Sequence, residues 1–345
     1  MTEPNKQPDP SHILQTATAF WASKVLLTAV ELDLFTTLGK GAMTAQQLGA
    51  ALGLHARGTY DFFDALVALK FLHRDGNGPE GKYRNTPDTS AFLDQASPKY
   101  IGGFAKMLNS RLYAFWGDLG TALKTGEPQS EAKHFQGNSI FDELYANEES
   151  LGNFLESMGG AQAANFEQLA HKFDFSRYNS VSDIGGAVAT LSRIVAGKHE
   201  HLVFNTFDLP PVAPLAQKHI DAAGLSDRIN VVSGNFFTDE LPKADVITMG
   251  NIIHDWNLEN KKILLQKAYD ALPPDGALVV IENIIDDERR ENVFGLLMSL
   301  NMLIELGDAF DYTGADFKTW CSEIGFSRFE FIHLTGPSSA AIAYK

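Results

Sequence analysis

The sequence predicts an α/β protein with two domains, a mostly α-helical winged-helix domain at the N-terminus and a Rossmann-like domain at the C-terminus. Apolar residues recur at helical spacing through the first third of the chain, and strand and helix patterns alternate beyond Tyr178. The length of 345 residues also exceeds what one hydrophobic core usually fills. We therefore expect a winged-helix domain over residues 1–100, a helical linker and substrate-pocket segment over 101–175, and the Rossmann-like domain over 176–345.

The N-terminal third predicts a winged helix whose first helices are apolar around much of their circumference. Helical periodicity runs from His12 to Leu38, and such helices need partners on more than one side. Thr44 stands at an N-cap position, Gly53 separates two short helices, and the second helix is expected over residues 59–72. Two short strands around a turn-rich segment then form the wing. The wide apolar coverage favours a homodimer built through this domain.

The charge distribution argues against nucleic acid and membrane surfaces as partners. Residues 1–100 carry nine basic and ten acidic side chains, and the whole chain has a formal charge of −15. No apolar run reaches the roughly 18 to 20 residues of a membrane span. The single cysteine, Cys321, cannot form an internal disulfide. The N-terminal residues from Met1 to Ser11 are polar and show no signal-peptide pattern. We expect a cytoplasmic protein, and we identify no candidate metal ligands.

The helical middle segment is rich in aromatic residues, most of which are expected in the core. Arg111, Tyr113 and Trp116 lie close together in the sequence and offer a cation and two rings to a small substrate. Phe154 and Met158 are further candidates for the lining of the same pocket.

The C-terminal part begins with a strand that ends in a glycine turn. The strand Val181–Ile184 runs into Gly185 and Gly186, and a helix follows from Thr190. Glycines at this point let the backbone approach a ligand closely, and the helix offers its N-terminus. The next strand ends at Asp208, where nucleotide-type Rossmann folds hold the ribose hydroxyls.

Three more strands are expected over residues 229–237, 244–249 and 277–281. The loop Asn251–Trp256 follows the second of them, and Glu282 follows the last. Active-site residues of this architecture collect at the carboxyl ends of the strands. A histidine in that loop, His254, has the intrinsic pKa to accept a proton near neutral pH.

Five motifs in order give the chain a resemblance to the plant-type class I O-methyltransferases, including their bacterial hydroxyindole-, phenazine- and polyketide-modifying members. The resemblance implies a class I methyltransferase fold with an N-terminal winged-helix dimerisation domain, S-adenosylmethionine as cofactor and S-adenosylhomocysteine as product. The motifs are Asp183-Ile184-Gly185-Gly186, Phe207-Asp208-Leu209-Pro210-Pro211, Gly234-Asn235-Phe236-Phe237, Pro242-Lys243-Ala244-Asp245 and Ile253-His254-Asp255-Trp256.

The resemblance also implies roles for individual residues. His254 corresponds to the catalytic base, with Glu282 as the family-matched partner of its imidazole and Asp255 and Asp311 as further carboxylates. The residues implied in cofactor binding are Asp183, Gly185, Gly186, Asp208, Leu209, Asn235, Phe236 and Trp256.

The chain departs from the family pattern at the cofactor loop. Ala187-Val188-Ala189 stands where the family continues with glycines, and Asn235 stands where the family has an acid. An amide oxygen can still accept from an adenine amino group, but without charge assistance. Two interpretations follow, either a working enzyme with a reshaped cofactor site or a dimeric ligand-binding relative that has lost methyl transfer.

The sequence leaves the small-molecule acceptor open. A hydroxyl acceptor would lose its proton to His254, so the rate should rise through a pKa near that of imidazole. The alternative is S-methylation of a thioether, such as the methylthio hydroxy acid of dimethylsulfoniopropionate synthesis, which needs no base. A cation such as Arg111 would then bind the substrate carboxylate.

Overall fold

The computed structural model describes residues 7–134 and 148–345 of the chain. The chain divides into two compact units, residues 1–113 and residues 114–345.

The first unit begins with a long helix whose two halves differ in burial. Helix α1 (Ser11–Glu31) buries residues only toward its C-terminal end, and helix α2 (Leu34–Gly39) follows after one left-handed residue, Asp33. Ala29 and Val30 of α1 and the buried side chains of α2 join one hydrophobic cluster with Phe63 and Tyr83. The N-terminal half of α1 therefore presents its apolar side chains outward.

The winged helix predicted from the sequence is confirmed. Helix α3 (Ala45–Ala51) begins with a capping box in which Thr44 and Gln47 exchange hydrogen bonds. Strands β2 and β3 form the antiparallel wing and extend, with β1, into a sheet of order β1-β3-β2. The bounds of these strands are Met43–Thr44 for β1, Leu72–Asp75 for β2 and Lys82–Asn85 for β3.

The second helix of the motif begins three residues earlier than its apolar pattern predicts. Helix α4 (Ala56–Ala68) is capped by His55, whose Nδ1 accepts from the backbone N–H of Arg57 at 3.2 Å. An imidazole can cap a helix in this way, but serine, threonine, asparagine and aspartate are the usual N-cap signals. Because His55 is not one of these usual signals, the N-terminus of α4 was not recognised, and the apolar pattern alone placed the start of the helix too late.

Helix α1 is long and apolar enough, by length and composition alone, to cross a membrane, and it is the only helix in the described ranges with that property. This differs from the expectation that no apolar run is long enough. That expectation was based on uninterrupted apolar runs. In α1, polar residues such as threonine and serine interrupt the apolar residues, but the mean hydropathy of the helix stays high.

Short helices follow the wing along the chain, and the long helix α10 comes after them. They include a π-helical turn, η2, between α6 and α7. Their bounds are Pro87–Phe92 for α5, Gly102–Met107 for α6, Leu108–Leu112 for η2, Tyr113–Phe115 for α7, Trp116–Asp118 for η3, Leu119–Thr125 for α8, Glu131–His134 for η4 and Glu148–Lys172 for α10.

The second unit contains a seven-stranded sheet of order β6-β5-β4-β7-β8-β10-β9. The chain builds β4, β5 and β6 outward to one side, then crosses to β7 and β8 on the other, with β10 antiparallel to its neighbours. The strand order thus reverses between β4 and β7, which is where ligands bind in such sheets. The strands are β4 (Ser180–Ile184), β5 (Val203–Asp208), β6 (Ile229–Ser233), β7 (Val246–Gly250), β8 (Ala277–Glu282), β9 (Arg328–His333) and β10 (Ser339–Tyr344).

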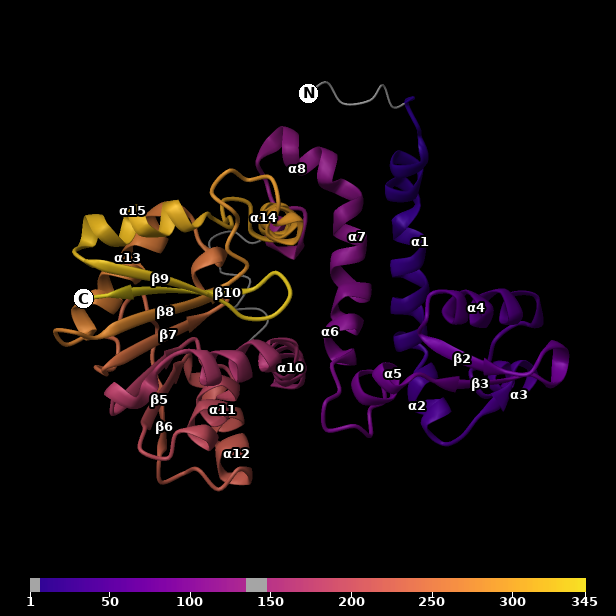
Figure 1. Ribbon diagram of the computed structural model, residues 1–345, viewed down its shortest axis with the longest axis horizontal. Coiled ribbons are helices and arrows are strands. Elements are labelled where there is room, and N and C mark those ends of the chain that lie inside the picture. The colour runs from indigo at the N-terminus through magenta and orange to yellow at the C-terminus, as the bar shows by residue number, and fades with distance from the viewer. Residues whose placement is uncertain (1–6, 135–147) are drawn as a thin grey trace. The chain divides into compact units, whose positions relative to one another are not determined.

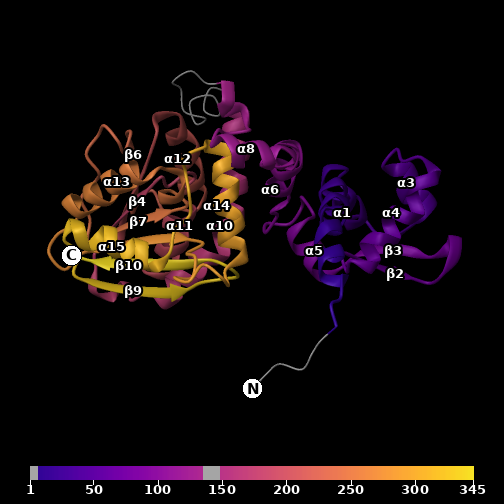
Figure 2. The same ribbon diagram turned by 90° about the horizontal axis from the view of Figure 1, so that it is seen from above.

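Helices cover both faces of this sheet (Figures 1 and 2), so that it forms the middle of three layers. Alternate residues of β8 point to opposite layers: Val279 and Ile281 join the cluster with α10, α11 and α12, while Leu278 and Val280 join the cluster with α13 and α15. The remaining elements are α11 (Thr190–Lys198), α12 (Ala213–Ala222), α13 (Leu258–Ala271), α14 (Val293–Leu306), α15 (Gly314–Ile324) and the 3₁₀ turns η5 (Phe175–Arg177), η6 (Pro210–Val212) and η7 (Ile253–Asp255).

Candidate active site

The glycine turn after β4 is held tightly against the neighbouring strand. Gly185 has a φ of +68°, and a Cβ there would lie 2.2 Å from the Ile252 side chain. The N–H of Gly185 donates to the carbonyl of Phe207 on β5 at 2.8 Å. Only glycine meets both requirements, so the turn brings bare backbone to the reversal point of the sheet.

The two alanines that replace family glycines keep the left-handed backbone. Ala187 has a φ of 48° and Ala189 a φ of 58°, and Ala189 is the N-cap of α11. An L-residue with a Cβ is strained in this region by about 1–2 kcal/mol. The chain therefore keeps the glycine-type loop path despite the substitutions.

Asp183 lies beneath this loop and ties three elements together. Its Oδ1 accepts from the hydroxyl of Thr248 on β7 at 2.8 Å, and its Oδ2 accepts from the hydroxyl of Ser192 on α11 at 3.1 Å. Burial raises the pKa of Asp183 to about 6, against the lowering effect of these two hydrogen bonds. The carboxylate thus supports the loop from below, and a direct contact with the cofactor remains a prediction.

Asp208, at the end of β5, faces a hollow at the edge of the sheet. Its Oδ2 accepts from the N–H of Ala187 at 2.9 Å and its Oδ1 from the N–H of Leu209 at 2.7 Å. The hollow is shallow and is lined by Ala187, Asp208 and apolar residues that include Val212 and Ala216. Each carboxylate oxygen can accept a further hydrogen bond, as the binding of two ribose hydroxyls would require, and ribose binding by Asp208 remains a prediction.

An aromatic cluster stands beyond β6 and β7. The ring of Trp256 meets Phe236 and Phe237 edge to face, with centroid distances of 5.8 and 4.6 Å. The Oδ1 atom of Asn235 accepts from the N–H of Phe237 at 2.9 Å and so shapes the turn that carries these rings. The roles of Asn235, Phe236 and Trp256 in adenine binding remain predictions, and Phe237, which was not predicted from the sequence, packs with the two rings.

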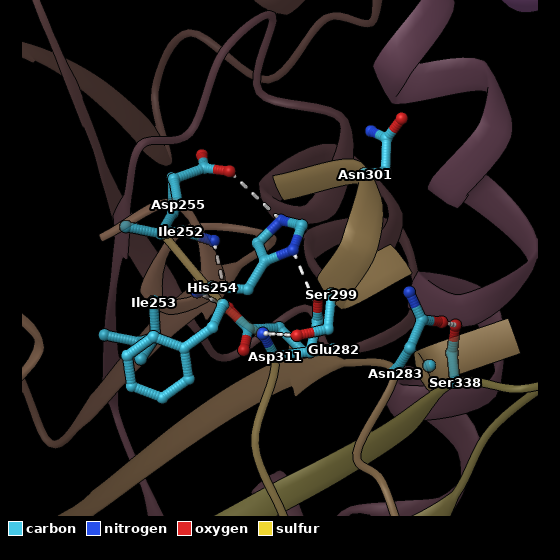
Figure 3. Close-up of polar contacts among 12 residues, drawn as sticks. Ile252, Ile253, His254, Asp255, Glu282, Asn283, Ser299, Asn301, Asp311 and Ser338 are labelled. Atoms are coloured by element: carbon cyan, nitrogen blue, oxygen red, sulfur yellow. Dashed lines mark hydrogen bonds and ion pairs between the residues drawn. The ribbon is translucent and has the colours of Figure 1, made fainter. Parts of the chain in front are cut away.

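His254 is buried in η7 between two aspartates (Figure 3). Its Nε2 lies 3.3 Å from Oδ1 of Asp255, and its Nδ1 lies 3.5 Å from Oδ1 of Asp311. These distances are longer than those of an ordinary N–H···O hydrogen bond, so the two contacts are ion pairs. Asp311 therefore pairs with His254 even though the sequence around it contains an extra residue.

Glu282 holds the loop rather than the imidazole, unlike the pairing implied by the resemblance. Its Oε1 accepts from the backbone N–H of His254 at 3.0 Å and from that of Ile252 at 3.2 Å (Figure 3). The reason is geometric, because Glu282 ends β8 directly beside the end of β7, where the loop begins. Its carboxylate meets the turn of η7 before it can reach the ring.

The surrounding charge changes the expected titration of His254. Burial alone would lower the pKa of His254, but the charges of Asp255, Asp311 and Glu282 outweigh it and raise the pKa to about 10. The carboxylates around His254 thus favour a pKa above that of free imidazole, the value that the sequence led us to expect. Burial raises the pKa of Asp255 to about 7, although the charge of His254 opposes this. The cluster shares its protons among close groups.

The candidate substrate residues fall into both units. Trp116 donates from Nε1 to Oδ1 of Asn301 at 2.9 Å, and Phe154 packs in a small apolar cluster with Val188 of the cofactor loop. Met158 lies half-buried one turn further along α10. Arg111 and Tyr113 belong to the first unit, where Lys24 lies 4.7 Å above the Tyr113 ring, and their role in a substrate pocket remains a prediction.

Several polar residues in this part of the structure were not predicted from the sequence. The Ser299 hydroxyl accepts from the backbone N–H of Asp311 at 3.1 Å, and Oδ1 of Asn283 accepts from the Ser338 hydroxyl at 2.9 Å (Figure 3). Tyr312 is fully buried beside Glu282, and burial with that charge raises its pKa. None of these residues stands in a spaced motif, so only the fold brings them together.

Comparison with known proteins agrees with this arrangement. A family model described as the O-methyltransferase domain matches residues 116–327, and one described as the O-methyltransferase dimerisation domain matches residues 14–95. The tetracenomycin polyketide synthesis 8-O-methyl transferase of Streptomyces glaucescens is 38% identical over 338 residues, covering 97% of each chain. The N,N-dimethyltransferase OxyT of Streptomyces rimosus is 35% identical over 314 residues, covering 91% of this chain and 90% of that one.

A solved structure shows the same likeness in three dimensions. Human N-acetylserotonin methyltransferase in complex with S-adenosylmethionine superposes with a TM-score of 0.89 at 28% identity, covering 99% of both chains. The chain belongs to the O-methyltransferase family and is an S-adenosylmethionine-dependent O-methyltransferase. The interpretation as a relative that has lost methyl transfer finds no support in these likenesses.

Proposed function

We propose that the enzyme methylates a phenolic hydroxyl of a polycyclic aromatic acceptor, with His254 as the general base. The observation that carries this proposal is the buried imidazole between two carboxylates at the reversal point of the sheet. Methylation of a phenol requires removal of a proton, and a positioned base contributes about 10² to 10⁴ in rate. The 38% identity to a polyketide 8-O-methyl transferase supports a hydroxyl acceptor, and the 29% identity to a 3-hydroxy-5-methyl-1-naphthoate 3-O-methyltransferase of Streptomyces sahachiroi supports an aromatic one.

Each polar residue of the site then has a part in the reaction. S-adenosylmethionine supplies the electrophilic methyl group when bound, and we propose that Asp208 holds its ribose while the rings of Phe236 and Trp256 flank its adenine. His254 takes the proton of the acceptor hydroxyl, Asp255 and Asp311 stabilise the imidazolium that forms, and Glu282 keeps the loop in place. The protein contributes mainly by holding the acceptor oxygen in line with the methyl group.

We also propose that the protein forms a homodimer through its first unit. We propose the cytoplasm as its location. The side chains of Ile13, Leu14, Phe20 and Trp21 on α1 are 54 to 70% exposed, which is unusual for large apolar groups on one helix. This helix lies within the match to the dimerisation domain. A second copy of the chain would remove these side chains from water.

An acceptor screen with trideuteromethyl-labelled cofactor tests the proposal. We expect label on oxygen with 1,8-dihydroxyanthraquinone or 1,3-dihydroxynaphthalene, located by mass spectrometry and NMR. The matched amine, 1,8-diaminoanthraquinone, should react poorly, and so should 4-methylthio-2-hydroxybutyrate, because neither offers an acidic hydroxyl on a ring. Turnover of the amine alone would favour N-methylation, the reaction for which the relative OxyT is named. Turnover of the thioether alone would favour S-methylation. Either outcome would overturn the proposed acceptor.

A further inference from the structure

Lys261 is buried where the local structure disfavours a cation. Among the residues that the structure describes, it is the only lysine or arginine that is fully buried. It ends the first turn of α13, near the positive end of the helix dipole, which repels an ammonium group. Removal of that group from water is also costly unless it is paired and hydrogen-bonded. Contacts beyond its own helix must therefore offset both effects.

The contacts of Lys261 join the two segments that carry the His254 pair. Its Nζ donates to the carbonyl of Ile253 at 2.7 Å and to the carbonyl of Phe310 at 2.8 Å. Ile253 comes immediately before His254, and Phe310 comes immediately before Asp311. One ammonium group thus fixes the main chain beside both His254 and Asp311. Nδ1 of His254 and Oδ1 of Asp311 lie 3.5 Å apart.

The charge of Lys261 also matters to the cluster. Three carboxylates, those of Asp255, Glu282 and Asp311, act on a single imidazole in a buried site. Burial lowers the pKa of Lys261 to about 8, and the same three carboxylates, together with Asp308, oppose this lowering. The group therefore stays mostly cationic at neutral pH, where it offsets part of the negative charge.

We propose that Lys261 is a positioning residue for methyl transfer, which fixes the His254 loop against the Asp311 segment and balances the carboxylates around the imidazole. This inference rests on the proposed function, since it gives Lys261 a role only if His254 acts as the base. Lys261 itself need not touch the cofactor or the acceptor. Its effect passes through two backbone carbonyls and through charge.

Replacement of Lys261 by methionine tests the role, because Lys261→Met keeps the length of the side chain but removes its charge and its donors. The matched control is Lys262→Met on the same helix, because Lys262 is only partly buried and pairs with Glu323 at 2.7 Å. With 1,8-dihydroxyanthraquinone as acceptor, we expect Lys261→Met to lower kcat by about 100-fold, the loss that follows misplacement of a reacting group. The KM for S-adenosylmethionine should stay unchanged, and the control should behave as wild type.

The pH profile supplies a readout that a purely structural role would not move. The titratable groups that face Lys261 are Asp255 from η7, Glu282 from β8, and Asp308, Asp311 and Tyr312 from the segment before α15, and three of these carboxylates also act on His254. Loss of the ammonium removes a charge that opposes the imidazolium, so the rise of rate with pH should move to higher pH in Lys261→Met.

NMR of protein labelled with ¹³C in its histidine rings supplies a second readout that needs no acceptor. The His254 signal, assigned by its loss in His254→Ala, should shift or broaden in Lys261→Met and stay unchanged in Lys262→Met. A folded Lys261→Met that binds S-adenosylmethionine and matches wild type in kcat, pH profile and this signal would overturn the inference. A parallel loss of cofactor affinity and kcat would also overturn it.

Two further outcomes separate this inference from the proposed function. If His254→Ala is as active as wild type, the proposed base fails, and the positioning role fails with it. If His254→Ala is inactive while Lys261→Met is normal, only the positioning role fails. Should Lys261→Met not fold, Lys261→Gln replaces it, and failure of both variants to fold would assign Lys261 to stability alone.

Discussion

At the scale of single residues, Asp208 carries the clearest expectation for cofactor binding. Asp208→Ala removes the carboxylate that faces the hollow and also the partner of the Ala187 N–H group. Hydrogen bonds to a charged group contribute about 1.5–3 kcal/mol, so we expect binding of S-adenosylhomocysteine to weaken by roughly 10- to 150-fold. Isothermal titration calorimetry measures this directly. Asp208→Asn, which keeps one acceptor oxygen, should lose less, and equal affinity in all three proteins would contradict the assignment.

The two left-handed alanines give a second prediction at this scale. Ala187 is only partly buried, so Ala187→Gly relieves backbone strain of about 1–2 kcal/mol and loses little packing. Ala189 is fully buried in a core cluster, and loss of its methyl group costs about 0.8 kcal/mol, which offsets much of the same relief.

We therefore expect Ala187→Gly to be more stable than wild type by about 1 kcal/mol, and Ala189→Gly to change less. Urea unfolding measures both variants, and cofactor affinity should stay equal or improve. A less stable Ala187→Gly, or one with much weaker cofactor binding, would show that the alanine methyl group has a function of its own.

At the scale of elements, Asp183 connects β4, β7 and α11 through two hydroxyl donors. Asp183→Ala leaves the hydroxyls of Thr248 and Ser192 buried without this partner, and we expect the free energy of unfolding to fall by about 2–4 kcal/mol. Ser192→Ala, which removes only one donor, should cost less than half of that. Equal effects of the two variants in urea unfolding would mean that the carboxylate does not act as the common partner.

The pKa of Asp183 adds a pH dependence to this network. Since burial raises its folded pKa to about 6, the folded state binds the proton more tightly than the unfolded chain does. The contribution to stability is thus fully present below pH 3.8, the ordinary value, and is lost as the pH rises toward 6. The amide side chain introduced by Asp183→Asn cannot titrate, so the free energy of unfolding of this variant should not show the loss with rising pH that Asp183 causes.

The elements were largely predictable from the sequence, because each carries a local signal. The capping residue Thr44, the left-handed Gly185 and the acid at the end of β5 mark positions where backbone geometry restricts the choice of residue. The start of α4 was misplaced since an imidazole caps it. The role of Glu282 and the presence of Lys261 in the site could not be predicted, because they depend on which strand ends and loops meet in space.

At the scale of the whole molecule, the account predicts an obligate dimer. Light scattering at micromolar concentration should give twice the chain mass of 37.8 kDa. Trp21→Glu places a charge on the exposed apolar face of α1 and should shift the protein toward a monomer or toward aggregation, since a buried unpaired charge is costly. Leu258→Glu, at an exposed position of α13, is the matched control and should remain dimeric. A fully active wild-type monomer would contradict the dimer.

The pH dependence of kcat/KM, measured for wild type and His254→Ala with chemistry as the slow step, tests whether His254 is the general base. The acting form of the base is the neutral imidazole, and the surrounding carboxylates raise the pKa of His254 to about 10. The account therefore predicts a wild-type rate that keeps rising from pH 6.5 to 9.5, and a His254→Ala rate lower by about 10² to 10⁴ without that rise. A flat wild-type profile, together with a His254→Ala variant near wild-type activity, would contradict the claim that His254 removes the proton of the acceptor.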